Sequence, residues 1–193
     1  MSSAAYDDEI WHLVPTDPGP PPARLSWFVR SLGRHQRVLD LGAGDGRLSA
    51  ELQAGQLTLA DVSAVALARA SERLPDARVV ELEPDAAVGL DDSSFDLVLC
   101  AETVEHVRDV QLLLSEARRV LRPGGMLAVT TPAHNRFTGL AIAVRGFERH
   151  FDPLSPHLRF FTSRSLAALL GAMGFEVVSL VTRAGTLLAV ATR

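Results

Sequence analysis

The sequence predicts an α/β fold with a doubly wound, mostly parallel seven-stranded sheet that ends in an antiparallel C-terminal hairpin. Three observations support this prediction. Strand-like and helical segments alternate along the chain, and the first strands are apolar throughout rather than at alternate positions. The last two strands are separated by too few residues for a parallel crossover. In such sheets we expect ligands at the carboxyl ends of the parallel strands.

The expected elements follow one another closely. Five parallel strands are "RVLDL" (37–41), "LTLAD" (57–61), "ARVVEL" (77–82), "FDLVLCA" (95–101) and "GMLAVTT" (125–131). Apolar residues at helical spacing predict helices over 25–32, 63–74, 110–121 and 166–173. Ser63 precedes its helix as a candidate N-cap. The segments "FEVVSLV" (175–181) and "TLLAVAT" (186–192) complete the sheet as a hairpin.

The length predicts one domain. A chain of 193 residues, 47% of them hydrophobic, fills a single core, so we expect one domain over 1–193. Residues 1–36 are expected to form an N-terminal arm and helix, in which Trp11 and His12 are candidates to cover a ligand. Residues 132–163 form a long connection at a strand's carboxyl end, which predicts a lid on the substrate side.

Charge and cysteine content narrow the choice of partner. The net charge is −4 and no basic stripe is present, which favours a small-molecule substrate and disfavours nucleic acid. The chain has neither a signal-peptide pattern nor an apolar run of membrane-spanning length, so no membrane partner is expected. The single cysteine, Cys100, fits a reducing compartment, and we expect a cytoplasmic protein. The oligomeric state is not predicted.

A glycine-rich loop follows the first strand. After Asp40 come three glycines at every second position, Gly42, Gly44 and Gly46. A backbone without side chains lets a ligand approach closely. The third glycine of the dinucleotide fingerprint is replaced here by Arg47, and the carboxylates of Asp40 and Asp45 would repel a pyrophosphate. The loop therefore favours a ligand with a positive charge over the cofactor of a dinucleotide-dependent oxidoreductase.

Acidic residues also follow the next two strands. Asp61 ends the second strand about 20 residues after Asp40, where a carboxylate accepts hydrogen bonds from a ribose diol. Asp85 follows the third strand, where its carboxylate could reach an adenine amino group. Acids at successive strand ends predict a site for a nucleoside attached to a cationic group.

Four segments together resemble the class I S-adenosylmethionine-dependent methyltransferases. These are "VLDLGAGDG", "LADVS", "SSFDLVLCAETVEHV" and "EARRVLRPGGMLAVTTP", and the similarity extends from about Arg37 to the end of the chain. The resemblance implies a Rossmann-like methyltransferase fold, S-adenosylmethionine as cofactor, and transfer of its methyl group to a small molecule, with a hydroxyl oxygen as the acceptor. Metal-dependent RNA ribose 2′-O-methylation and cofactor binding without catalysis remain alternatives.

The resemblance also implies positions for the cofactor. Asp40, Gly42 and Gly44 border its methionine and ribose portions, and Asp61 binds both ribose hydroxyls. Val62 covers one face of the adenine, while Asp85 and the backbone of Ala86 hold its edge. Glu102, at the end of the fourth strand, is a further expected contact. The third-strand motif reads "PDAA" here, where the family usually has "GDA".

The stretch "AETVEHV" supplies the candidate catalytic residues. In a helical turn, Glu102, Glu105 and His106 would share one face. Three interpretations stay open: a structural role at a helix start, His106 as general base assisted by Glu102, or a Mg²⁺ or Mn²⁺ site formed by all three residues. The pattern E-x-x-E-H resembles an element of ubiquinone-type O-methyltransferases and of small-RNA ribose methyltransferases. His157 is a further catalytic candidate, and either it or His134 could complete the metal site.

Overall fold

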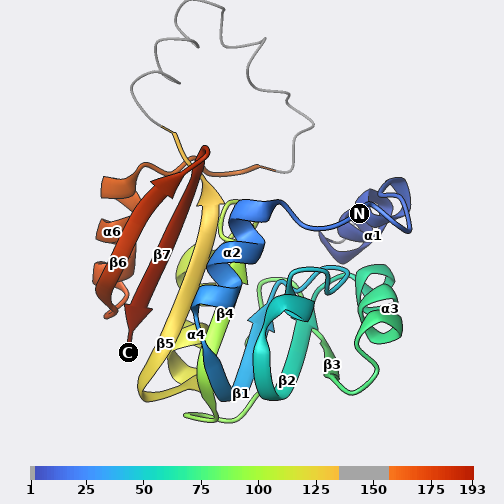
Figure 1. The fold of residues 1–193 in the computed structure, drawn as a ribbon, viewed down its shortest axis with the longest axis horizontal. Helices are drawn as coiled ribbons and strands as arrows, with labels where there is room; N and C mark the ends of the chain where they lie inside the picture. The colour runs from blue at the N-terminus through green and yellow to red at the C-terminus, as the bar shows by residue number, and fades with distance from the viewer. Residues whose placement is uncertain (1–2, 135–156) are drawn as a thin grey trace, which may run out of the picture.

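A computed structural model describes residues 3–134 and 157–193. It confirms the expected α/β architecture, with seven strands in one sheet (Figure 1). The helices are α1 (Ser3–Leu13), α2 (Ala23–Ser31), the short 3-10 helix η1 (Ser49–Glu51), α3 (Ala64–Arg73), α4 (Val110–Val120) and α6 (Ser163–Ala172). Among the described residues, no helix has the length and apolar character needed to cross a bilayer.

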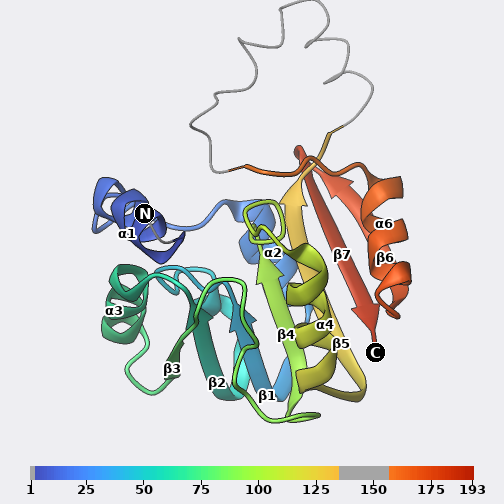
Figure 2. The same cartoon turned by 180° about the vertical axis from the view of Figure 1, so that it is seen from behind.

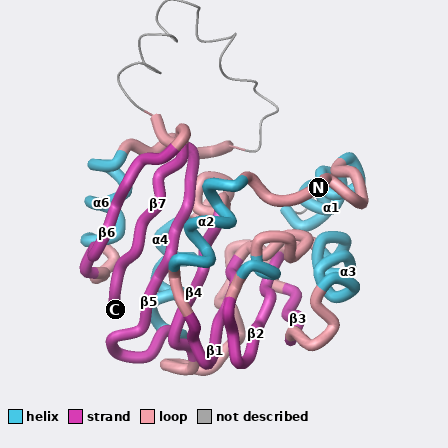
Figure 3. The backbone as a smooth tube through the Cα atoms, viewed as in Figure 1, coloured by secondary structure: helices cyan, strands magenta, loops and turns pink. Residues whose placement is uncertain are grey.

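The strands lie side by side in the order β3-β2-β1-β4-β5-β7-β6 (Figure 3). Their bounds are β1 (Arg34–Leu41), β2 (Gln53–Asp61), β3 (Arg78–Glu81), β4 (Phe95–Ala101), β5 (Leu121–Pro132), β6 (Glu176–Arg183) and β7 (Thr186–Thr192). The first five strands are parallel, and β7 runs antiparallel to both β5 and β6. The carboxyl ends of β1, β2 and β4 therefore meet at one edge of the sheet.

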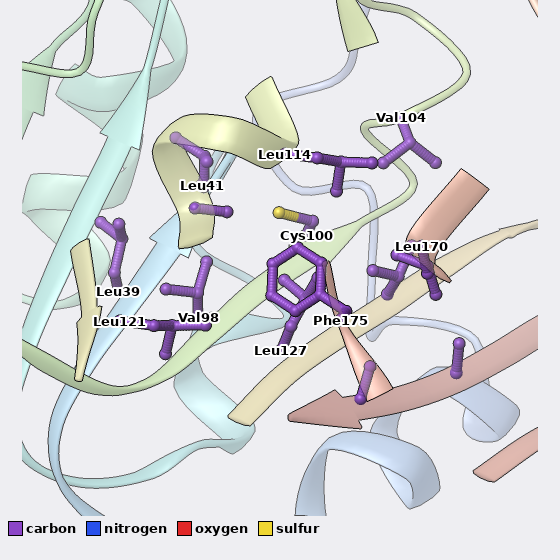
Figure 4. Close-up of a cluster of buried hydrophobic side chains, with 14 of the residues drawn as sticks. Leu39, Leu41, Val98, Cys100, Val104, Leu114, Leu121, Leu127, Leu170 and Phe175 are labelled. Carbon is purple, nitrogen blue, oxygen red and sulfur yellow. The ribbon is translucent and has the colours of Figure 1, made fainter. Parts of the chain in front are cut away.

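Helices cover both faces of the sheet, as the apolar strands predict. On one face α2 buries Leu25, Phe28 and Val29 against strand residues such as Val38 and Leu97. On the other face lie α4 and α6, which Figure 2 shows in front of the strands. Figure 4 shows part of that second core, in which leucines from β1, β5 and both helices lie around Cys100, together with Val98 from β4. Each fully buried leucine contributes about 1.5–3 kcal/mol through the removal of apolar surface from water.

Side-chain caps fix where three helices begin. Ser63 caps α3 as predicted, because its hydroxyl accepts a hydrogen bond from the Ala66 amide. Asp109 caps α4 by accepting from the Leu112 amide. Thr162 and Ser165 form a reciprocal capping box at α6. These caps set the starting points of the helices that follow β2, β4 and the segment after β5.

Three parts of the chain differ from the sequence prediction or lie outside the described residues. The N-terminal arm contains a complete helix, α1, which the weak apolar pattern of its sequence does not reveal. Strand β5 begins at Leu121, directly after α4 and four residues before the expected start at 125. Most of the expected lid over 132–163, residues 135–156, lies outside the described residues.

Candidate functional site

The loop after β1 takes a conformation that requires glycine. Gly42 and Gly44 have φ angles of 87° and 55°, in the left-handed region. A Cβ atom at Gly42 would lie 2.4 Å from Cγ2 of Thr103, and one at Gly44 would lie 2.7 Å from the ring of Trp11. The bare backbone therefore leaves room for two protein side chains, one from the end of β4 and one from α1, beside the ligand space.

A cavity of about 320 Å³ lies at the carboxyl ends of β1, β2 and β4. Its walls bring together eight of the residues predicted from the sequence: Gly42, Gly44, Asp61, Val62, Asp85, Ala86, Glu102 and His106. Asp40, Glu105 and His157 do not line it. These eight come from the ends of four strands, β1 to β4, and the loops after them, so the topology of the sheet is what gathers them.

Asp61 is held by backbone amides. Its Oδ2 accepts a hydrogen bond from Gly44 N at 2.8 Å, and its Oδ1 accepts one from Ser63 N at 3.0 Å. Burial raises the pKa of Asp61, while these hydrogen bonds oppose the rise. The carboxylate thus joins the glycine loop to the start of α3, and each of its oxygens keeps a further lone pair for a ligand.

Asp40 lies behind the cavity wall. It is 2% exposed, and its Oδ2 accepts a hydrogen bond of 2.6 Å from the Ser49 hydroxyl. Its Oδ1 is buried without a hydrogen-bond partner among the described residues. Burial raises the pKa of Asp40 to about 7, against the lowering effect of Ser49. No contact between Asp40 and the cavity is seen, so its role toward the cofactor stays a prediction.

Asp45 does not act as the sequence suggested. The carboxylate was expected to repel a pyrophosphate, but it is buried and paired with two cations. Arg47 Nε lies 2.9 Å and Arg73 Nη2 lies 3.5 Å from its Oδ2. Because both ion pairs neutralise the charge, the argument against a pyrophosphate cannot rest on Asp45. The side chain instead ties the loop to the end of α3.

Asp85 lies in the cavity wall opposite a cation. Its φ angle is 57°, and its Oδ2 lies 3.6 Å from Nη1 of Arg108, which belongs to the loop after β4. Both side chains are substantially exposed, so this ion pair is weak. The pair crosses the cavity between the segments after β3 and β4.

The segment after β4 is not a helical turn. Glu102 has a φ angle of 52°, and only a tight turn follows, closed by a hydrogen bond from His106 N to Thr103 O. The expectation that Glu102, Glu105 and His106 share a helical face is therefore wrong, because the left-handed residue redirects the chain. The Glu102 carboxylate accepts a hydrogen bond of 2.8 Å from the Thr130 hydroxyl. Burial raises the pKa of Glu102.

A second group forms on the far side of this turn. Ligand-type atoms of Glu105, His106 and His157 lie within 4.8 Å of one another. Leu158 N and Arg159 N donate to the Glu105 carbonyl, which holds His157 beside His106 with their ring centroids 4.8 Å apart. The Glu105 side chain is buried, and neither of its carboxylate oxygens has a hydrogen-bond partner among the described residues. Burial raises its pKa to about 7.

Sequence reasoning missed one wall of the cavity. Helix α1 contributes Asp7, Ile10 and Trp11, and the segment after it contributes Val14. Trp11 and His12 were both expected to cover the ligand; Trp11 lines the cavity, whereas His12 is exposed and lies outside the wall. Further wall residues come from the loops after β3 and β4 and from α4: Leu82, Glu83, Pro84, Val88, Thr103, Val107, Arg108, Asp109, Leu112, Leu113 and Glu116. Pro84, Thr103, Val107 and Glu116 lie within the quoted motifs without having been predicted as site residues, and the other positions lie outside those motifs.

Comparisons with known proteins agree with this geometry. A family model described as a methyltransferase domain matches residues 39–129. A ubiquinone biosynthesis O-methyltransferase of Aromatoleum aromaticum is 32% identical over 173 residues, which cover 83% of this chain and 73% of that protein. The chain belongs to the S-adenosylmethionine-dependent methyltransferases. A ubiquinone biosynthesis O-methyltransferase of Azorhizobium caulinodans is 33% identical over 153 residues.

The chain spans only part of the length of some relatives. The similarity to the Azorhizobium protein covers 75% of this chain but only 60% of that protein. The fold of this chain is similar to the crystal structure of a methyltransferase of Thermotoga maritima, with a TM-score of 0.71 and 22% identity. That similarity covers 95% of this chain and 91% of the other. S-adenosylmethionine is the cofactor of the family, and the cavity lies where this fold class binds ligands.

Proposed function

We propose that the protein transfers a methyl group from S-adenosylmethionine to a hydroxyl oxygen of a small molecule. One observation carries the proposal: Asp61 and Gly44, expected to bind the cofactor, line the same cavity as Glu102 and His106, which can handle a proton. A site that only binds a nucleoside has no need of a titratable imidazole beside it. The relatives named for ubiquinone biosynthesis carry out O-methylation, which supports oxygen as the acceptor.

In the proposed reaction the protein has two tasks: it aligns the acceptor hydroxyl with the methyl group of the cofactor, and it removes the proton of that hydroxyl. The cofactor supplies an electrophilic methyl group on its sulfonium. His106 is partly exposed at the cavity wall, so its imidazole can take the proton that an acceptor hydroxyl loses. Asp61 and the loop at Gly44 fix the cofactor, and apolar wall residues such as Leu41 exclude water.

Two further side chains assist His106 in this proposal. Glu102 is anchored by Thr130, so it can accept a hydrogen bond from the acceptor or from the cofactor's amino group without moving. His157 packs against His106, with their ring centroids 4.8 Å apart. His157 is thus proposed to contact the acceptor.

As an alternative, Glu105, His106 and His157 bind a divalent metal. Glu105 has a buried carboxylate whose oxygens lack hydrogen-bond partners among the described residues, and a cation would satisfy it. Glu105, His106 and His157 would then hold Mg²⁺ or Mn²⁺, whose chemistry would be to lower the pKa of an acceptor hydroxyl. Glu102 lies outside this group, since its carboxylate is bound to Thr130.

Calorimetry tests the proposal directly. S-adenosylmethionine, S-adenosylhomocysteine and NAD are titrated into the protein, each with and without MgCl₂ or MnCl₂. We expect both adenosyl compounds to bind and NAD not to bind; the reverse result would contradict the proposal. Binding of Mn²⁺ to the wild-type protein but not to Glu105→Gln would favour the metal alternative. If the wild-type protein fails to bind Mn²⁺ even when the acceptor is present, His106 as base is favoured.

A panel of acceptors separates the remaining functions. Methyl transfer to phenols and other small hydroxyl compounds is compared with transfer to the 3′-terminal ribose of short RNAs. The net charge of −4 argues against RNA, because phosphate contacts dominate such binding. Binding of S-adenosylmethionine with no transfer to any acceptor would instead support a protein that binds the cofactor without catalysis.

A further inference from the structure

Two neighbouring acids in α1 have opposite surroundings. The Asp8 carboxylate accepts hydrogen bonds from Ser63 Oγ at 2.6 Å and from Val65 N at 3.2 Å. It therefore sits at the positive N-terminal end of α3, and the Ser63 hydrogen bond lowers its pKa. Asp7 is half-buried in the cavity wall and has no hydrogen-bond partner among the described residues.

Helix α1 is fixed to α3 at its middle, through Asp8, and at its C-terminal end. Beyond the Asp8 contact, the guanidinium of Arg69 donates to the Trp11 carbonyl at 2.8 Å and to the Val14 carbonyl at 3.1 Å. The same guanidinium lies 5.9 Å from the centroid of the Trp11 ring. Figures 1 and 2 both show α1 beside α3, at the edge where the parallel strands end. The orientation of Asp7 is thus set by several contacts rather than by a free arm.

The cavity gives Asp7 a specific neighbour. Asp7 and Asp61 line the same cavity, and no other described side chain of α1 brings a charge into it. Burial, followed by the charges of Asp61 and Asp8, raises the pKa of Asp7 to about 6, while Arg108 opposes the rise. Two carboxylates that face one ligand space repel each other until hydrogen-bond donors enter between them.

We propose that Asp7 is a further cofactor-binding residue, which joins Asp61 in accepting hydrogen bonds from the ribose hydroxyls of S-adenosylmethionine. The proposal rests on the proposed function, because it needs the cofactor in this cavity. Each oxygen of Asp61 already accepts one backbone N–H, from Gly44 or Ser63. A ribose diol offers two further donors, and Asp7, in the wall of the same cavity, adds a second carboxylate acceptor to the remaining lone pairs of Asp61.

The fold also couples cofactor binding to the position of α1. Since Trp11 packs over Gly44 and Asp7 faces the ligand, the cofactor would contact both α1 and the loop after β1. Release of α1 from α3 would remove the contacts of Asp7 and Trp11 together. Arg69 is the group that holds the end of α1, so its loss should weaken cofactor binding although it lies outside the cavity wall.

The protein offers a direct probe of these contacts. It has two tryptophans, Trp11 and Trp27, and Trp27 is exposed on α2. In a Trp27→Phe background, fluorescence therefore reports on Trp11 alone. S-adenosylmethionine and S-adenosylhomocysteine are titrated into this background and into its Asp7→Ala, Arg69→Ala and Glu9→Ala variants. Glu9 is the matched control, an exposed acid on the same helix.

We expect Asp7→Ala to weaken both ligands by the same factor, about tenfold, because a ribose contact is common to both. Arg69→Ala should also weaken both, and Glu9→Ala neither. Unchanged affinity in Asp7→Ala would overturn the role of Asp7. A loss confined to S-adenosylmethionine would also overturn it, because that result would mean that Asp7 acts on the sulfonium charge. If the background protein binds neither ligand, the proposed function itself fails.

Discussion

The two sides of the cavity differ in how their polar groups are satisfied. At the ends of β1 and β2, Asp61 is bound by two backbone amides and Asp45 by two arginines. At the end of β4, Glu102 takes a left-handed conformation, and Glu105 is buried without hydrogen-bond partners for its carboxylate among the described residues. The carboxylates of Asp61 and Asp45 are thus both engaged, whereas the Glu105 carboxylate has no hydrogen bond among the described residues. Asp40 Oδ1, behind the wall at the end of β1, shares this lack of a partner.

This difference fits two separate tasks. Binding benefits from groups that are already oriented, because less entropy is lost when the ligand arrives. Proton transfer and metal binding need groups with perturbed pKa values and free lone pairs, which cost stability in the folded protein. We therefore expect substitutions on the β1–β2 side to change affinity and those on the β4 side to change turnover.

The strongest test of this division is His106→Ala. Loss of a general base should lower turnover about 100- to 10,000-fold, measured as methyl transfer to an acceptor found in the panel. Affinity for S-adenosylhomocysteine should change less than twofold by calorimetry. His12→Ala, an exposed histidine outside the cavity wall, is the control and should keep wild-type turnover. A collapse of cofactor affinity in His106→Ala would contradict the division.

The next largest effect concerns Asp40 and pH. Burial raises its pKa in the folded protein from 3.8 to about 7. The stability that this group contributes is therefore complete below its ordinary pKa and is lost as pH rises through about 7. A pKa difference of about three corresponds to at most roughly 4 kcal/mol.

Asp40→Asn should remove the contribution of Asp40, while Glu105 and Asp7, whose pKa values are raised to about 7 and about 6, keep theirs. Urea unfolding at pH 4 to 8 measures it, and the free energy of unfolding should fall less with pH in the variant than in wild type. Asp76→Asn, an exposed acid on the other side of α3, should leave the wild-type curve unchanged. An identical curve for Asp40→Asn would show that Asp40 is not protonated at neutral pH.

Asp61→Ala should weaken the cofactor about 10- to 100-fold, because a charged acceptor on the ribose is lost. The loss combines the direct contact with the freeing of the Gly44 and Ser63 amides. Calorimetry with S-adenosylhomocysteine measures it, with Asp91→Ala at the opposite edge of the sheet as the control. Turnover at saturating cofactor should stay within a few-fold of wild type. A loss of turnover as large as that of His106→Ala would contradict the assignment of binding to the β1–β2 side and turnover to the β4 side.

The smallest expected effect is on the loop itself. Gly42→Ala should destabilise the protein by about 1–3 kcal/mol in urea unfolding, because the new Cβ meets Thr103 and the φ angle is left-handed. Gly33→Ala shares the positive φ but has open space around it, so it isolates the backbone cost. Adding Thr103→Ala to Gly42→Ala should reduce the difference between the destabilisation caused by Gly42→Ala and that caused by Gly33→Ala. Equal costs at Gly42 and Gly33 would mean that the Thr103 contact is unimportant.

The sequence predicted best where local patterns determine the structure. Ser63 as a cap follows from residue type alone, and the hairpin at 184–185 follows from the short spacing of two apolar strands. The strand ends that carry Asp61 and Glu102 were also placed correctly. The sequence-based prediction failed at Glu102, because no sequence pattern signals its left-handed conformation. It also failed at Asp45, whose ion-pair partner Arg73 lies far along the chain.

The sequence by itself thus determined the alternation of strands and helices, the glycine loop and the family, because these depend on spacing and on short motifs. Only the tertiary structure decided which side chains share the cavity. It brought α1 with Asp7 against the end of β2 and set His157 beside His106. Such contacts join segments 50 or more residues apart, and they arise from packing across the sheet edge, which no local pattern encodes.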